Sequence, residues 1–77
     1  MRKRLRLKIF GTVQGIFFRH SAKIKFEELG IRGLARNEAD GSVYLEAEGE
    51  EAVLDQLLAW CEKGPPLACV ERVEILD

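Results

Sequence analysis

The sequence predicts an α+β fold in which two helices cover one face of a four-stranded sheet. In four short segments, apolar residues alternate with polar ones, which is typical of strands with one buried face. In two longer segments, apolar residues recur every three or four positions, which is typical of amphipathic helices. A chain of 77 residues has room for one domain, so residues 1–77 are expected to form a single unit.

The first strand and the first helix are the clearest predictions. Leucine and isoleucine alternate with arginine and lysine over residues 4–10, which predicts a half-buried strand. From residue 18 to residue 29, apolar side chains recur at spacings of four, four and three, so a helix is expected there. Gly30 follows at the position where a left-handed residue commonly ends a helix.

A hairpin is expected next, with strands at residues 31–37 and 42–48. The dipeptide Asp40-Gly41 between them is a strong turn signal. Gly33 interrupts the second strand and indicates a bulge or a close approach of another segment.

The second helix is expected to open at residues 49–51, where carboxylates favour a helix N-terminus. It is expected to end at residues 63–66, which carry a lysine, a glycine and two prolines. Residues 70–76 complete the order strand, helix, strand, strand, helix, strand. With right-handed crossovers, this order gives the ferredoxin-like split β-α-β arrangement, which hosts many unrelated functions.

Composition narrows the class of protein. No apolar run approaches the length of a membrane span, and no signal peptide is expected. Two cysteines, far in sequence from the single histidine, indicate free thiols in a reducing cytoplasm. Residues 1–37 carry ten basic and two acidic residues, whereas residues 38–77 carry two basic and eleven acidic ones. This asymmetry favours an anionic ligand at the N-terminal half, unless folding mixes the two halves.

Residues 11–19 carry the strongest functional signal. Two glycines bracket a turn between a strand and a helix, where free backbone N–H groups can cradle an anion. Arg19 would lie in the first helical turn and offer a fork of donors to two phosphate oxygens. The alternative is a glycine-containing turn followed by an ordinary surface arginine.

Two stretches closely resemble the acylphosphatase family. Residues 11–19 are similar to that family's phosphate loop, Gly-x-Val-Gln-Gly-Val-x-Phe-Arg. Residues 33–43 are similar to its asparagine strand and turn, and the late segments 64–66 and 70–73 also match. The resemblance implies a metal-independent and cofactor-free enzyme that hydrolyses acyl phosphates to a carboxylate and inorganic phosphate.

The family's functional residues fall on matching positions of this chain. Arg19 would bind the phosphoryl group, and Asn37 would hold the attacking water. The cradle would consist of backbone N–H groups at four loop residues, Gly15, Ile16, Phe17 and Phe18. The implied partners are a small-molecule acyl phosphate and inorganic phosphate as product and inhibitor, with no membrane and no nucleic acid. A monomer is expected, with strand exchange or edge pairing as the alternative.

The chain also departs from the family pattern. Phe17 stands where a small residue is common, and Leu34 replaces an aromatic residue. Because the sequence stops at residue 77, a C-terminal edge strand is expected to be missing, which would leave the strand of Asn37 at an open edge.

Two other functions are compatible with the same fold. One is a non-catalytic domain that binds phosphate for regulation. The other is an RNA-binding module that would use the basic face of residues 4–8 together with Tyr44. Two side chains also have ordinary structural alternatives: Asn37 could complete a turn, and His20 could be a surface residue.

Overall fold

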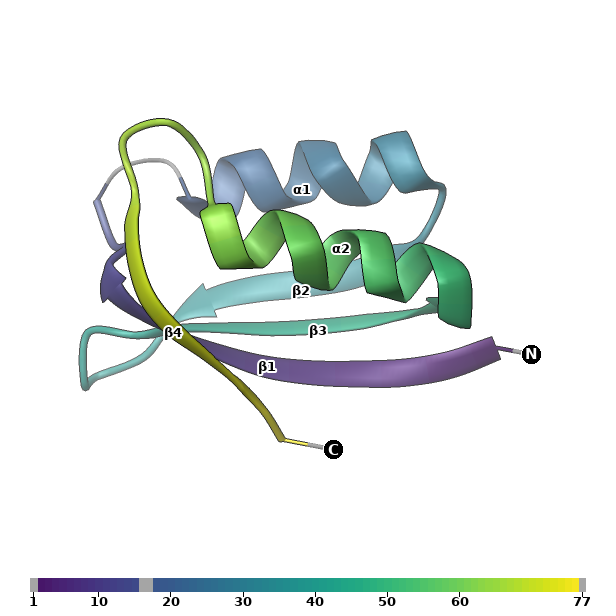
Figure 1. Ribbon diagram of the computed structural model, residues 1–77, viewed down its shortest axis with the longest axis horizontal. Coiled ribbons are helices and arrows are strands. Elements are labelled where there is room, and N and C mark those ends of the chain that lie inside the picture. The colour runs from purple at the N-terminus through teal and green to yellow at the C-terminus, as the bar shows by residue number, and fades with distance from the viewer. Residues whose placement is uncertain (1, 16–17, 77) are drawn as a thin grey trace.

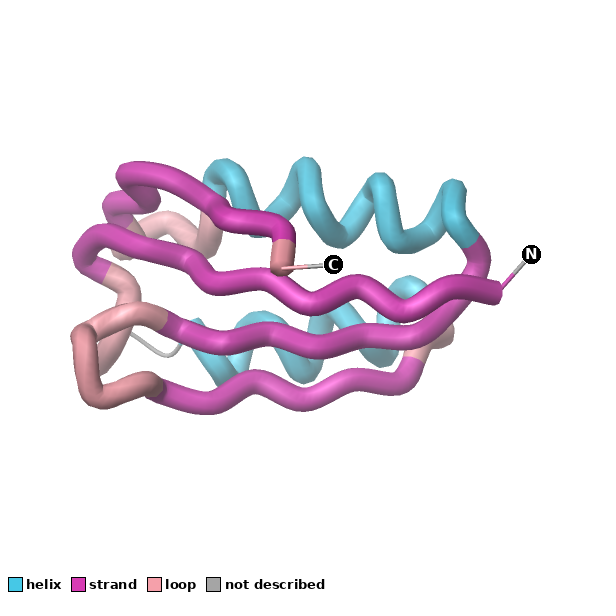
Figure 2. Tube along the Cα trace, turned by 90° about the horizontal axis from the view of Figure 1, so that it is seen from below, coloured by secondary structure: helices cyan, strands magenta, loops and turns pink. Residues whose placement is uncertain are grey.

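The computed structural model describes residues 2–15 and 18–76, in which α1 and α2 cover one face of a four-stranded antiparallel sheet (Figure 1). The elements in chain order are β1 (Arg2–Thr12), α1 (Phe18–Leu29), β2 (Arg32–Asn37), β3 (Val43–Glu50), α2 (Glu51–Lys63) and β4 (Cys69–Ile75). The strands lie in the order β2-β3-β1-β4, so β1 and β3 are central (Figure 2). The predicted fold class and element order are confirmed.

The strand β3 ends at Glu50, two residues beyond the strand predicted over residues 42–48. Gly49 was expected to open the second helix, but it lies within β3 opposite Lys3. A Cβ at Gly49 would come within 2.6 Å of Cγ2 of Ile31, so a larger residue would not fit beside that side chain. The glycine therefore lets the segment after α1 pack directly on the β3 backbone.

The C-terminal strand predicted over residues 70–76 is present as β4. The strand expected to be missing is a further one, which would lie beside β2. β4 pairs with β1 from Leu7↔Ile75 to Thr12↔Cys69 and forms one edge of the sheet. Within the part of the chain that is described, β2 pairs with β3 alone and forms the other edge, as expected for the strand of Asn37.

The core lies between the sheet and the two helices. Its buried apolar residues come from every layer: Leu7, Ile9, Val13, Phe18, Ala22, Phe26, Val43, Leu45, Ala47, Leu54, Leu57 and Cys61. Gly33 confirms the predicted close approach, because a Cβ there would lie 2.8 Å from Cζ of Phe26 on α1. Neither α1, with 12 residues, nor α2, with 13, has the length and apolar character of a membrane-spanning helix.

A register shift between Phe10 and Gly11 bends the end of β1. Gly11 has φ 134°, and a Cβ there would lie 2.0 Å from the carbonyl oxygen of Cys69. Only glycine fits this backbone conformation and this contact. The bend turns the chain out of the sheet and into the loop that leads to α1.

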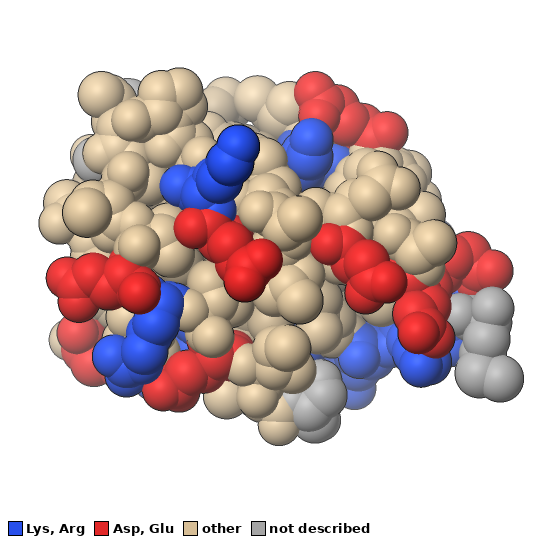
Figure 3. All heavy atoms as spheres, in the orientation of Figure 1, with Lys and Arg blue, Asp and Glu red and all other residues tan. Residues whose placement is uncertain are grey.

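Folding mixes the basic and acidic halves of the sequence. The basic strand β1 pairs with β3, whose carboxylates form ion pairs across the ladder, as in Arg4–Glu46 at 3.1 Å. Lys3 likewise pairs with Glu51 at 2.7 Å. On the face that carries α2 and β4, basic and acidic side chains lie beside one another (Figure 3). Most of the charge asymmetry along the sequence is therefore neutralised locally.

Candidate active site

The predicted phosphate loop connects two buried anchors. Val13, at 1% exposed, fixes its start, and Phe18, also at 1%, is the first residue of α1. Between them, Gly15 has φ 75°, a conformation that glycine adopts readily. The predicted loop residues Ile16 and Phe17 lie outside the described residues.

Gln14 joins this loop to the turn between β2 and β3. Its Nε2 atom donates one hydrogen bond to the carbonyl oxygen of Glu38 and one to that of Ser42, each at 2.8 Å. A primary amide has two N–H donors, so both are used. The loop is thereby fixed against the turn that begins one residue after Asn37.

The turn itself is held by a carboxylate. Asp40 accepts hydrogen bonds from the hydroxyl of Ser42 and from its backbone N–H at 2.9 Å, and it pairs with Nζ of Lys8 at 2.9 Å. The Ser42 hydroxyl, followed by Lys8 and the Ser42 amide, holds the pKa of Asp40 well below its ordinary value of 3.8. Backbone bonds from Glu38 to Ser42 and from Gly41 to Glu38 complete the turn.

Asn37 is the last residue of β2 and lies opposite Val43 in the ladder. Its side chain is exposed, and in residues 2–15 and 18–76 no hydrogen bond occupies its carboxamide. The alternative role of Asn37, completing the turn, is filled by Asp40, Ser42 and Gln14 instead. The carboxamide therefore remains available to a ligand or a water molecule.

Arg19 is the second residue of α1, and its side chain is exposed. Among the described residues, no carboxylate pairs with it, whereas Arg4 and Lys8 each have an acidic partner. The first turn of α1 contains no acidic residue. The start of α1 and the end of β2 lie at the same end of the molecule (Figure 1). Both predicted side chains therefore belong to the end of the sheet that carries the loop.

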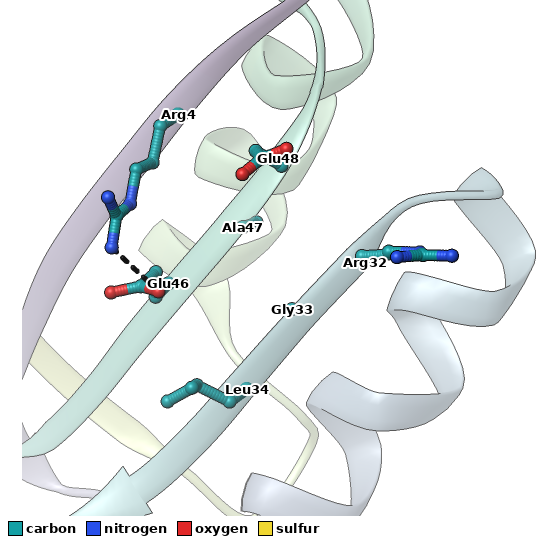
Figure 4. A pocket seen from close by; sticks show the side chains of 7 residues that line it. All are labelled: Arg4, Arg32, Gly33, Leu34, Glu46, Ala47 and Glu48. Carbon is teal, nitrogen blue, oxygen red and sulfur yellow. Dashed lines mark ion pairs between the residues drawn. The ribbon is translucent and has the colours of Figure 1, made fainter.

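A hollow on the open face of the sheet is a different feature (Figure 4). It is lined by residues of the three strands β1, β2 and β3: Arg4, Arg32, Gly33, Leu34, Glu46, Ala47 and Glu48. Arg4 pairs there with Glu46, as the dashed line marks. With acidic and basic groups facing one another, the hollow does not offer the concentrated positive charge that an anion requires.

In the described part of the chain, the aromatic rings on the open face of the sheet are covered by basic side chains. Tyr44 is only 6% exposed, because the guanidinium of Arg36 lies 4.4 Å from its ring centre. The Phe10 ring is flanked by Arg72 at 3.9 Å and by Lys8 at 5.6 Å. Since RNA-recognition sheets stack bases on accessible aromatic rings, these contacts disfavour the RNA-binding alternative.

Gln14 lies within the predicted loop, but the sequence alone indicates no role for it. A glutamine between a valine and a glycine carries no local sign that its partners are carbonyls of a distant turn. His20 is exposed, which agrees with its interpretation as a surface residue. In the described part of the chain, no group of three His, Cys, Asp or Glu side chains is arranged to hold a metal ion.

Comparison with known proteins identifies the class. The acylphosphatase family model matches residues 5–77. An acylphosphatase of Methylococcus capsulatus is 48% identical over 97% of this chain and 82% of its own length. An acylphosphatase of Rubrobacter xylanophilus is 48% identical over 95% of this chain, which spans 66% of that relative.

Solved structures agree with the sequence matches. The acylphosphatase of Coxiella burnetii superimposes with a TM-score of 0.91 at 38% identity, covering 96% of this chain and 78% of its own. The Bacillus subtilis acylphosphatase gives a TM-score of 0.91 at 28% identity, with coverages of 97% and 82%. The fold thus defines a small α+β protein in which a glycine-containing loop leads from β1 to α1. The chain belongs to the acylphosphatase family, as the resemblance implied, and this supports the predicted hydrolase activity on acyl phosphates.

Proposed function

We propose that this chain hydrolyses acyl phosphates through Arg19, Asn37 and the loop backbone, without a metal or cofactor. The observation that carries the proposal is the pair of 2.8 Å hydrogen bonds from Gln14, which hold the loop beside the turn that follows Asn37. This arrangement gives one ligand access to the loop and to the end of β2.

In this proposal, the loop and Arg19 bind the phosphoryl group. Backbone N–H groups of Gly15, Ile16, Phe17 and Phe18 point to its oxygens, aided by the positive end of the α1 dipole. The guanidinium of Arg19 donates two parallel hydrogen bonds to the phosphoryl oxygens. The absence of acidic residues from the first turn of α1 supports this role, because no carboxylate competes with the ligand there.

Asn37 orients the water that attacks phosphorus. The water oxygen forms a bond to phosphorus while the bond between phosphorus and the acyl oxygen breaks, and its electron pair leaves with the carboxylate. A carboxamide does not accept the water proton at neutral pH, so a phosphoryl oxygen of the substrate takes it. Positioning and charge stabilisation then supply most of the rate, as is general for phosphoryl transfer.

Benzoyl phosphate hydrolysis tests the proposal directly. The wild-type chain should release benzoate and phosphate, with no loss of rate in a chelator and with inhibition by free phosphate. Arg19→Lys should lose most of the activity, because a point charge does not replace a bidentate fork. Arg32→Lys is the matched control, since Arg32 is an exposed arginine at the far end of β2 from Asn37.

The outcomes separate the candidate functions. Full activity of Arg19→Lys would remove Arg19 from the mechanism. Phosphate binding by the wild type without turnover of benzoyl phosphate would favour the non-catalytic phosphate-binding domain. A chelator-sensitive rate would contradict metal independence.

The proposal includes a monomeric single domain that works in the cytoplasm. Both cysteines are free, which supports a reducing compartment. Pairing of two β2 edges about Leu34 would set Arg32 of one copy against Arg36 of the other, and directly opposed like charges destabilise a strand pair. Light scattering after gel filtration should therefore give the mass of one chain; a dimer mass would contradict this part of the proposal.

A further inference from the structure

We infer that Gln14 is a positioning residue, which sets the separation between the phosphate loop and the water-orienting carboxamide of Asn37. The inference rests on the proposed function of the loop and of Asn37, and it assigns a role to a side chain whose two N–H donors both bind the turn.

The hydrogen bonds of Gln14 reach both ends of the turn. One donor binds the carbonyl of Glu38, the residue that follows Asn37, and the other binds the carbonyl of Ser42. These two carbonyls belong to residues 24 and 28 positions away in sequence. In residues 2–15 and 18–76, Gln14 supplies the hydrogen bonds that link loop to turn.

The turn is also held by hydrogen bonds that do not involve Gln14. The Asp40 carboxylate binds the Ser42 backbone N–H and hydroxyl, and Lys8 holds the same carboxylate to β1. The backbone N–H of Glu38 also donates to the carbonyl of Ser42 at 2.9 Å. A change at Gln14 therefore moves the loop relative to a turn that keeps its own shape.

The loop is anchored in the core at both ends. Val13 and Phe18 are buried, whereas Gly15 is exposed. The amide of Gln14 is half-buried and lies between these anchors. Loss of its two bonds would leave the core contacts intact while the loop shifts laterally with respect to Asn37.

Binding and chemistry respond differently to such a shift. In the proposed function, phosphate affinity depends on the loop and on Arg19, and both Phe18 and Arg19 belong to the anchored first turn of α1. Attack by water depends in addition on the position of Asn37 relative to the bound phosphorus. Because a misplacement of about 1 Å can cost roughly a hundredfold in rate, kcat should fall while KM and phosphate inhibition change little.

The test is a double-mutant cycle on benzoyl phosphate hydrolysis. Gln14→Met keeps the length of the side chain but removes both donors, and Gln56→Met on α2 is the control at an exposed glutamine. We expect Gln14→Met to lower kcat about tenfold to a hundredfold with KM within about twofold. In the Asn37→Ala background, Gln14→Met should cause almost no further loss of kcat, because both changes disrupt the same positioning of the attacking water.

Two results would overturn the inference: an unchanged kcat in Gln14→Met, or losses that multiply fully in the double variant. A binding measurement keeps the inference testable if the chain lacks turnover. Inorganic phosphate should shift the side-chain amide resonances of Asn37 in the wild type, and this shift should be lost in Gln14→Met while phosphate affinity is retained. Absence of turnover with this NMR result would reject the proposed hydrolysis alone, whereas an identical shift in both proteins would reject the role of Gln14.

Discussion

The ring of Phe18 packs against the indole of Trp60, with 5.4 Å between the ring centres and 56° between the ring planes. This contact joins the first residue of α1 to the last turn of α2. A Cβ on Gly64, which ends α2, would lie 3.1 Å from Cε2 of Phe18, so the glycine leaves room for the ring. The aromatic pair thus fixes the position of Phe18, the residue that directly precedes Arg19.

Phe18→Ala should destabilise the fold and the site together. Removing a buried phenylalanine ring costs about 3–5 kcal/mol in the free energy of unfolding. Urea denaturation followed by Trp60 fluorescence measures this loss. Phe10→Ala is the control, because the Phe10 ring lies half-buried on the open face of the sheet, and its loss should cost clearly less. Equal losses in the two variants would contradict the anchoring role of Phe18.

Asn37→Ala should lower kcat for benzoyl phosphate by roughly a hundredfold to a thousandfold, in the range found for removal of a single positioned donor. KM should change little, since the loop and Arg19 hold the phosphoryl group. The urea midpoint should stay close to that of the wild type, because the Asn37 side chain is exposed and, among the described residues, no hydrogen bond of the turn depends on it. A raised KM with an unchanged kcat would make Asn37 a binding residue instead.

Asp40→Asn should reduce stability in a pH-dependent manner. The pKa of Asp40 is lowered in the folded state, first by the Ser42 hydroxyl and then by Lys8, so ionised Asp40 stabilises the fold. That stabilisation is complete above the ordinary pKa of 3.8 and declines as the pH falls toward the lower folded-state value. The difference in urea midpoint between wild type and variant should be constant from about pH 8 to pH 5 and shrink below about pH 4.

Asp55→Asn provides the comparison for this measurement, because Asp55 is an exposed carboxylate on α2 outside the turn. Its stability difference from the wild type shows how much of any pH dependence arises without the contacts of Asp40. If the Asp40→Asn difference instead persists unchanged down to pH 2, the carboxylate charge does not contribute through its contacts with Ser42 and Lys8.

The two cysteines should react at very different rates. Burial, with a smaller effect from Glu62, raises the pKa of the Cys61 thiol to about 12, so almost no thiolate exists at pH 8. Cys69 is exposed at the start of β4. A thiol-disulfide reagent should label one cysteine in the native protein and a second only after denaturation. Cys69→Ser should abolish the native reaction, and labelling that survives this change would contradict the burial of Cys61.

Sequence patterns predicted the elements well because those patterns are local. The bounds of α1 follow from the spacing of its apolar residues and from Gly30, whose φ of 67° ends the helix as expected. The end of α2 is confirmed in the same way, since Gly64 has φ 72° and donates its backbone N–H to the carbonyl of Trp60 at 2.7 Å. Each of these features depends on neighbours within a few residues.

Sequence patterns could not predict features that depend on residues distant in the chain. Alternation predicted that Tyr44 points outward, but it could not show that Arg36 on β2 would cover the ring. The sequence could not show that Cys61 is buried and Cys69 exposed, because Cys69 lies on β4 at the edge of the sheet. The partners of Gln14 belong to another hairpin, so no local signal distinguished this glutamine from a surface residue. The roles of Arg19 and Asn37 remain predictions.

β1 runs from one end of the sheet to the other, so Arg2 lies at the end remote from the loop (Figure 1). A linker or fluorophore joined ahead of Arg2 would be held away from incoming ligand by the length of an eleven-residue strand. Protein immobilised on beads through this end would present the loop to the surrounding solution, so catalytic assays on a solid support should not suffer from steric blocking.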